Sequence, residues 1–507
     1  MDFAAQSSSL GRNAWAWCVL AFLLLVLIAG GTPRYGSYAD VPLELVSLPI
    51  ILVAVLRLAG RPAMPGMMAA FTLCAATLLL PLVQLIPLPP AIWTALPGRG
   101  FVVEAFAAAR IDLTWMPLSL SPPATLRSFL SLFPALAVFL ATLTLTHQER
   151  RTATLIIVAF GIASVVLGLA QIAGGPQSAL RIYDVTNRGS AVGLFANRNH
   201  FAALLYCVMP LTAAWMIHLV QTQGLQKWAG VALAGVIYGS LILGLGISAS
   251  RAGIALAMLA ILASLLLAWR KREEETRNRV SKVVFIAGLA GIFAVLQFGL
   301  AGILSRLDKD PTEEGRLVIA QVTWRAATSV FPVGSGIGTF IPFYAMFETP
   351  AEIGGNYANH AHNDWLELWL EGGVPAALIA AAFLAWLGLR IGHSWKRENG
   401  LDWLLARAAS ISIVLLLLHS VVDYPLRTAA LAAVFAFGCA LILDLPQPKR
   451  RSSRRIRTGS SADADTREGS RIRTAGRSRT SLAGNEPADR EEAQPIRPYS
   501  AKSGKFQ

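Results

Sequence analysis

Long apolar segments without charge constrain this sequence more than any other feature. Residues 13–33, 152–174 and 283–303 contain no charged side chain. A helix of about 20 apolar residues crosses a hydrocarbon core of about 30 Å. The whole chain is 54% hydrophobic and only 15% charged, which is too apolar for an ordinary water-exposed surface. The sequence therefore predicts an all-α, polytopic membrane protein.

About twelve transmembrane helices are expected from the apolar runs. The expected spans are residues 14–31, 42–59, 66–88, 125–146, 152–174, 199–220, 228–247, 252–269, 283–303, 364–390, 402–421 and 426–444. The first run is interpreted as an uncleaved span, because it is long and lacks a clear small-residue cleavage site.

Basic residues in the short connections set the predicted orientation. Arg57, Arg61, Arg150, Arg151 and the cluster 270–272 fall on one side of the predicted spans, as does the tail 446–507. Positive residues favour the cytoplasmic side, so both termini are expected there. The tail has 15 Lys and Arg against 7 Asp and Glu, which is +8 of the chain's net +14. We interpret this tail as disordered and attracted to anionic lipid, not as a nucleic-acid site.

The opposite side receives residues 89–124, 175–198 and a large loop, 304–363, before the tenth span. Four polar residues, Asn197, Arg198, Asn199 and His200, stand directly before a span on this side. An asparagine there caps the helix, and Arg198 beside the helix N-terminus forms an anion site. The alternative is simple interfacial capping with an arginine that extends to the membrane surface.

Ser248-Ala249-Ser250-Arg251 repeats this arrangement at a later span, with Ser250 as the expected cap. Arg251 in the first turn opposes the helix dipole, which favours a role such as holding a phosphate over plain anchoring. In the large loop, Arg316 precedes a glycine run, residues 334–338. This run forms either an anion-binding nest or, as we expect, a tight turn.

The densest polar cluster is Asn359-His360-Ala361-His362-Asn363-Asp364, followed by Glu367 and Glu371. If a helix begins near His360, its side chain shares one face with Asp364, Glu367 and Glu371. A carboxylate beside a histidine fixes its tautomer, as a general base requires. The alternatives are a zinc site at the H-x-H pattern and a structural histidine pair. Between the last two spans, Asp423 is either a further polar site residue or only a helix cap.

These motifs together resemble the O-antigen ligase and polymerase superfamily. The resemblance covers residues 121–443 and rests on GLFANRNHFA, SASRAG, EGRL, GSGIGTF and HAHNDWLELWLEGG. It implies a GT-C-like fold in the bacterial inner membrane and a glycosyltransferase active site on the periplasmic face. It also implies transfer of a glycan from undecaprenyl diphosphate to an acceptor hydroxyl, without a cofactor or a metal.

The resemblance also assigns roles to residues. Arg251 and Arg316 are expected to hold the diphosphate, and His362 to activate the acceptor hydroxyl. His360, Asn363 and Glu367 are expected to support His362, while the group Asn197, Arg198, Asn199, His200 and Asp423 is expected to bind substrate.

We expect the chain to have three parts, and we consider three activities for it. The parts are N-terminal helices with the first periplasmic loop (1–120), the ligase-like membrane domain (121–445) and the basic tail (446–507). The first activity is O-antigen ligase with lipid A-core as the acceptor, and the second is the sister O-antigen or exopolysaccharide polymerase. A transporter, for example of inorganic carbon, is the alternative of another class. It would place charged residues near mid-membrane.

Overall fold

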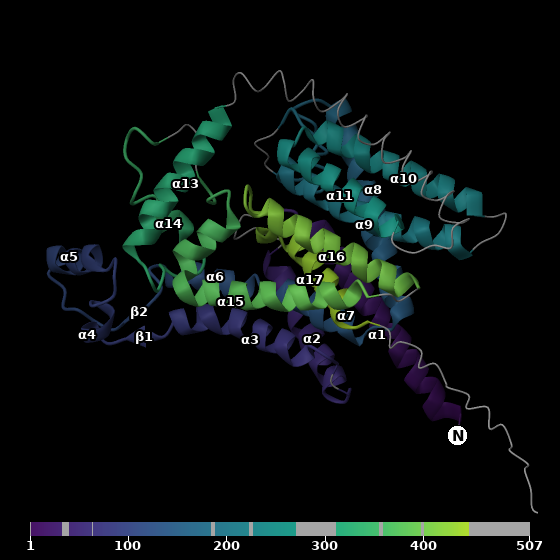
Figure 1. The fold of residues 1–507 in the computed structure, drawn as a ribbon. Coiled ribbons are helices and arrows are strands. Elements are labelled where there is room, and N and C mark those ends of the chain that lie inside the picture. The colour runs from purple at the N-terminus through teal and green to yellow at the C-terminus, as the bar shows by residue number, and fades with distance from the viewer. Residues whose placement is uncertain are drawn as a thin grey trace, which may run out of the picture. The chain divides into compact units, whose positions relative to one another are not determined.

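The computed structural model describes residues 2–32, 40–62, 64–183, 188–222, 227–269, 311–353, 358–396 and 400–445. Helices dominate this part of the chain (Figure 1). The described strands are β1 (Pro87–Leu88) and β2 (Met116–Pro117), a short antiparallel pair with Pro87 opposite Pro117. The prediction of an all-α protein is therefore confirmed. The predicted span 283–303 and the tail 446–507 lie outside the described residues.

Helices follow the apolar runs closely, because backbone groups in a bilayer must be hydrogen-bonded within the segment. The N-terminal helices are α1 (Asp2–Ala29), α2 (Asp40–Ala59), α3 (Met67–Gln84), α4 (Pro90–Trp93), α5 (Gly100–Ala109), α6 (Pro122–Leu130), α7 (Phe133–Thr144) and α8 (His147–Ala173). The next are α9 (Arg198–Thr222), α10 (Lys227–Ser248), α11 (Arg251–Trp269), α13 (Pro311–Ser329) and α14 (Phe340–Tyr344). The last are α15 (Asp364–Ser394), α16 (Leu401–His419), the 3-10 helix η1 (Pro425–Arg427) and α17 (Ala429–Leu443).

Seven described segments are long and apolar enough to cross a membrane: α2, α3, α6 with α7, α8, α9, α15 and α16. Shorter apolar stretches occur in α1, α5, α10, α11 and α17. Every predicted span within the described ranges overlaps a helix, so the chain is a multi-pass membrane protein. The span expected at 125–146 consists of two helices. Pro134, near the start of α7, has no N–H and cannot continue the helical hydrogen bonds of α6.

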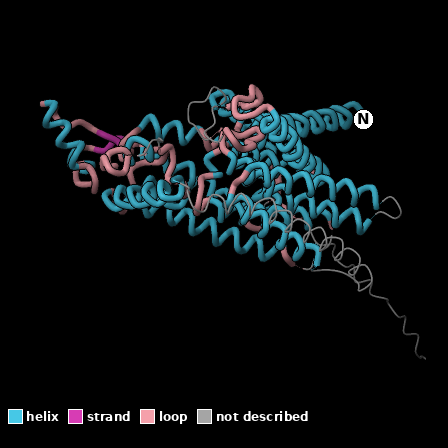
Figure 2. Tube along the Cα trace, turned by 90° about the horizontal axis from the view of Figure 1, so that it is seen from above, coloured by secondary structure: helices cyan, strands magenta, loops and turns pink. Residues whose placement is uncertain are grey.

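The loop expected at 304–363 is partly helical. Its described part contains α13 and α14, which pack against each other and against α15 (Figure 1). Figure 2 shows the β1–β2 pair at one end of the helices. The apolar core of the bundle is centred on α9 and α16, whose side chains are mostly buried, whereas most side chains of α2, α3 and α15 are only partly buried or exposed.

Hydrogen bonds gather several helix ends at one end of the bundle. Gly30 after α1 accepts from Ala430 of α17, and Gly31 accepts from Ala196 just before α9. Ala191 donates to Ile247 near the end of α10, and Asp364 at the start of α15 donates to Ser420 after α16. The polar segments before α9, α11, α15 and α17 are therefore neighbours, although they are far apart in the sequence.

Candidate active site

Asp423 lies at the centre of this end of the bundle. It follows α16, and its N–H donates to the His419 carbonyl (2.9 Å), which holds the chain in a tight turn. The carboxylate is completely buried. Its Oδ2 accepts a hydrogen bond from Asn199 Nδ2 at 2.5 Å, and its Oδ1 lies 3.2 Å from His362 Nδ1. His419 Nε2 is 4.0 Å from Oδ2. We call Asn199, His362, His419 and Asp423 the Asp423 cluster.

His362 occupies a strained and partly exposed position. Its φ angle of 51° is in the left-handed region, which costs a non-glycine residue about 1–2 kcal/mol. Its side chain is 21% exposed, whereas that of Asp423 is fully buried. With the Nδ1–H directed at the carboxylate, Nε2 keeps its lone pair for a proton. The imidazole is therefore held in the tautomer that a general base needs.

Asn197 caps α9 and Ser250 caps α11, as the sequence predicts. Asn197 Oδ1 accepts from the Asn199 N–H (2.8 Å), and Ser250 Oγ accepts from the Gly253 N–H (3.1 Å). Ser250 Oγ also donates to Asn199 Oδ1 at 2.8 Å. Ser250, the cap of α11, is thereby connected through Asn199 to Asp423. Arg251 directly follows this cap in the sequence. Ala249, just before this cap, also has a left-handed backbone, with φ 51°.

The predicted arginines stand on three different helices, α9, α11 and α13. Arg316 on α13 donates from Nη1 to the Val422 carbonyl at 3.4 Å, beside Asp423. Arg251 stands in the first turn of α11. Arg198 Nη1 lies 3.5 Å from Ser190 Oγ, so its guanidinium reaches the segment that precedes α9. Arg316 thus contacts the residue before Asp423, and Arg251 follows Ser250, which is hydrogen-bonded to Asn199.

Tyr424 joins three histidines from two segments of the chain. Its ring centroid lies 5.0 Å from that of His200, 4.5 Å from His360 and 4.9 Å from His362. Its hydroxyl is 3.5 Å from the amide nitrogens of both Asn197 and Asn359. The ring is 4% exposed. Our sequence interpretation gave Tyr424 no role, although its position directly after Asp423 in an otherwise polar motif was a usable signal.

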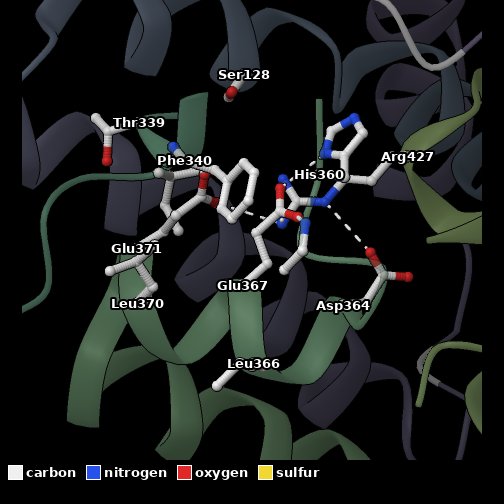
Figure 3. A network of polar contacts seen from close by, with 12 residues as sticks. Ser128, Thr339, Phe340, His360, Asp364, Leu366, Glu367, Leu370, Glu371 and Arg427 are labelled. Carbon is white, nitrogen blue, oxygen red and sulfur yellow. Dashed lines mark hydrogen bonds and ion pairs between the residues drawn. The ribbon is translucent and has the colours of Figure 1, made fainter. Parts of the chain in front are cut away.

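A second polar group surrounds Arg427 in η1 (Figure 3). The guanidinium lies 3.3 Å from the carboxylates of Asp364, Glu367 and Glu371. Those three side chains share one face of α15, because they are spaced by three and four residues. With His360, which follows below, we call these residues the Arg427 cluster. Three carboxylates on one face at a membrane-helix end indicate in the sequence that a cation is needed, but not that Arg427 supplies it.

His360 belongs to this second group and not to the helix. Its Nδ1 is 2.8 Å from Glu367 Oε1, and Glu367 Oε2 accepts from the Ala361 N–H at 2.8 Å. α15 begins at Asp364, where the expected span 364–390 starts, so the condition that would place His360 on the helix is not met. The reason is Asn363, whose extended backbone and side chain cap the helix by accepting from the Leu366 N–H at 3.0 Å.

The glycine run 334–338 forms a tight turn, as expected. Gly334, Gly336 and Gly338 all have positive φ. The turn's N–H groups are already occupied: Ser335 donates to the Leu370 carbonyl (3.0 Å), Gly336 to the Glu371 carbonyl (2.9 Å) and Ile337 to Gln84 Oε1 (2.8 Å). A nest needs unoccupied N–H groups, so this turn instead attaches the large loop to α15. It meets α15 at a kink, where Gly373 has φ 54°.

Burial and neighbouring charges act in opposite directions on these groups. Burial raises the pKa of a carboxyl, yet the pKa of Asp423 lies well below its usual range, because His362 hydrogen-bonds to it and the imidazoles of His200, His362 and His419 favour the charged form. Burial lowers the pKa of His360, but the Glu367 carboxylate raises it above the ordinary value. Burial and the charge of Asp423 raise the pKa of Tyr424, so its hydroxyl stays protonated.

The two histidines of the H-x-H pattern point to different partners. His360 faces Glu367 and His362 faces Asp423. In the described part of the chain, no three His, Cys, Asp or Glu side chains are grouped to hold a metal ion. Asp423 caps no helix, since its carboxylate is occupied by side chains, so the capping alternative for it is wrong. The described geometry thus gives the two histidines different carboxylate partners and different exposure, 4% for the His360 side chain and 21% for that of His362.

Comparison with known proteins identifies part of this chain. Residues 236–381 match the family model described as O-antigen ligase. The matched segment includes Arg251, Arg316, His360, His362, Asn363 and Glu367, whereas Asn197 to His200 and Asp423 lie on either side of it. No curated protein matches the chain.

Proposed function

We propose that this protein is a membrane glycosyltransferase of the O-antigen ligase and polymerase superfamily, which moves a glycan from undecaprenyl diphosphate to an acceptor hydroxyl. The match of residues 236–381 to the O-antigen ligase family model supports this proposal. The proposed acceptor is lipid A-core, which makes the activity that of an O-antigen ligase. The proposed location is the bacterial inner membrane. The site faces the periplasm and both termini lie in the cytoplasm.

The reaction needs one base and one cationic site. His362 Nε2 removes the proton of the acceptor hydroxyl as that oxygen attacks the first carbon of the glycan. The bond from this carbon to the carrier phosphate breaks, and undecaprenyl diphosphate leaves with the electron pair. Attack opposite to the leaving group inverts the configuration at this carbon. The proton on His362 then passes to solvent or to the leaving phosphate.

Arg251 and Arg316 are proposed to neutralise the diphosphate as it leaves. A guanidinium binds two phosphate oxygens at once and stays charged at every physiological pH. In this proposal, these two residues supply the positive charge that a metal ion supplies in other phosphate chemistry. The N-terminus of α11, next to Arg251, adds the positive end of a helix dipole.

The observation that supports this function best is the contact between His362 and Asp423. A fully buried carboxylate that orients a partly exposed imidazole is the arrangement used to prepare a general base. Asn199 holds the other carboxylate oxygen, so Asp423 cannot turn away from His362. A transporter is less well supported, because the described buried carboxylates of both clusters gather at helix ends and not at mid-membrane.

Deletion of the gene tests this function in cells. Lipopolysaccharide and secreted polysaccharide are analysed separately in the deletion strain. If the protein is a ligase, its loss leaves lipid A-core without polymer, and the polymer accumulates on the carrier. Single repeats on the core would instead indicate the polymerase activity. Normal glycans together with lost bicarbonate uptake would contradict both.

A further inference from the structure

A cavity of about 420 Å³ opens beside the Arg427 cluster, between α2, α3, α6, α7, α15 and α17. It adjoins a second cavity of about 230 Å³ between α3, α7, α15 and α17, and both are lined by Phe383 and Phe435. No charged residue lines the second cavity. The two cavities together form a space that is polar at one end and apolar along the rest of its length.

The polar end is strongly acidic. Asp40 and Glu44 line it from α2, and Asp364 and Glu371 line it from α15. The positively charged lining residue is Arg427, which already lies 3.3 Å from Asp364 and from Glu371. Four carboxylates facing one paired guanidinium repel an anionic group, and the low dielectric around them strengthens the repulsion. A phosphorylated headgroup therefore fits poorly at this end.

Hydroxyl groups line the same end. Ser128 is 3% exposed, and its Oγ has no hydrogen-bond partner among the described residues. It lies beside the glycine turn, because a Cβ added to Gly338 would be only 2.0 Å from its Oγ. Ser131 and Thr428 also line the cavity. The hydroxyls of Ser131 and Thr428 donate to the carbonyls of Ser128 and Pro425, and their lone pairs can still accept hydrogen bonds from a ligand hydroxyl.

We propose that this cavity binds an amphiphile with an apolar chain and an uncharged, hydroxyl-bearing headgroup. The apolar chain lies along Phe383 and Phe435. The headgroup meets Ser131, Thr428 and the carboxylates, whose oxygens accept hydrogen bonds from hydroxyls. The ligand is a glycolipid in chemical class and is distinct from a diphosphate carrier. This site lies beyond the proposed transfer reaction and does not depend on it.

Photo-crosslinking in phosphatidylcholine nanodiscs tests the proposal on the full-length protein, without any glycan donor. Two probes have the same dodecyl chain with the same diazirine: one is a β-maltoside and the other a phosphate monoester. Mass spectrometry then locates the labelled peptides. The maltoside probe should label α15 and α17 around Phe383 and Phe435, about tenfold more than the phosphate probe, given the cost of an anion beside carboxylates.

Matched variants test the place and the cause of this preference. Ala380 lines the cavity, whereas the adjacent Ala381 is exposed and does not. A380W should remove most of the labelling and A381W should leave it unchanged. Glu44→Gln should raise labelling by the phosphate probe. Equal labelling by both probes in the unmodified protein, or full labelling in A380W, would overturn the proposal. Labelling as expected in a protein that transfers no glycan would contradict only the transfer reaction.

Discussion

The imidazole Nδ1 of His362 faces the carboxylate Oδ1 of Asp423 at 3.2 Å, across 61 residues of sequence. One partner is fully buried between α16 and η1, and the other is on a strained loop that leads into α15. This pairing fixes which nitrogen of His362 has the proton. The proposed chemistry depends on that tautomer.

Asp423→Asn should therefore lower kcat with little change in KM for the donor. An asparagine keeps the shape but offers either a neutral oxygen or an amide N–H to His362. The loss of orientation and of charge stabilisation should reduce kcat by about 10²–10⁴. Steady-state glycan transfer in proteoliposomes measures it. Glu352→Gln, in the exposed Arg325–Glu352 ion pair, is the control and should retain full activity. A KM effect alone would contradict an orienting role.

Tyr424 should matter through its ring and not through its hydroxyl. The ring contacts three imidazoles, whereas the hydroxyl makes only two long hydrogen bonds of 3.5 Å. Tyr424→Phe should keep near-normal activity and stability. Tyr424→Ala should lower the free energy of unfolding by about 3–5 kcal/mol, as other deletions of large buried rings do. Thermal unfolding in detergent compares the two variants. An equal loss of stability in both variants would show that the hydroxyl, and not the packing of the ring, stabilises the fold.

His360 should stabilise the fold more strongly at low pH than at high pH. Its pKa is raised above the unfolded value of about 6.5, because it pairs with Glu367. Its contribution is therefore fully present below about pH 6.5 and is lost as the pH rises through the folded pKa. The difference in Tm between the unmodified protein and His360→Asn should shrink from pH 6 to pH 9. A difference that grows over this range would contradict the pairing.

Gly373→Ala should destabilise the junction between the glycine turn and α15. Gly373 has φ 54°, and an added Cβ would lie 2.2 Å from the Pro332 carbonyl oxygen. Gly388→Ala in the same helix is the control, because its Cβ would meet nothing within 4 Å. Alanine there should raise stability by about 0.5–1 kcal/mol. The two variants should thus shift Tm in opposite directions. A shift in the same direction for both would contradict the claim that the kink requires glycine at position 373.

Much of the fold was predictable from the sequence, because long apolar runs dictate helices in a bilayer. The caps at Asn197 and Ser250 were also predictable, since capping depends on local sequence. The start of α15 agrees with the expected span 364–390, but the sequence left open whether His360 belongs to the helix, because several polar residues precede it and only the observed backbone shows that Asn363 is the cap. The break between α6 and α7 was missed, although Pro134 signalled it.

The contacts within the site were harder to predict. His360 and His362 are two residues apart, yet they pair with carboxylates from different elements. Periodicity placed Glu367 near His360 but could not place Asp423 near His362, because that contact joins distant segments. Arg427 lies in a short 3-10 helix that no sequence period indicates, so its three ion pairs appear only in the folded chain.

Release of undecaprenyl diphosphate by purified protein in proteoliposomes tests the central proposal most directly. Carrier-linked glycan and acceptor are supplied, and free carrier diphosphate is measured together with the glycosylated acceptor. The unmodified protein should form both products in equal amounts. His362→Ala, at equal expression and with unchanged Tm, should lose about 10²-fold or more of this rate. Full activity in His362→Ala would contradict the proposed role of His362 as the base.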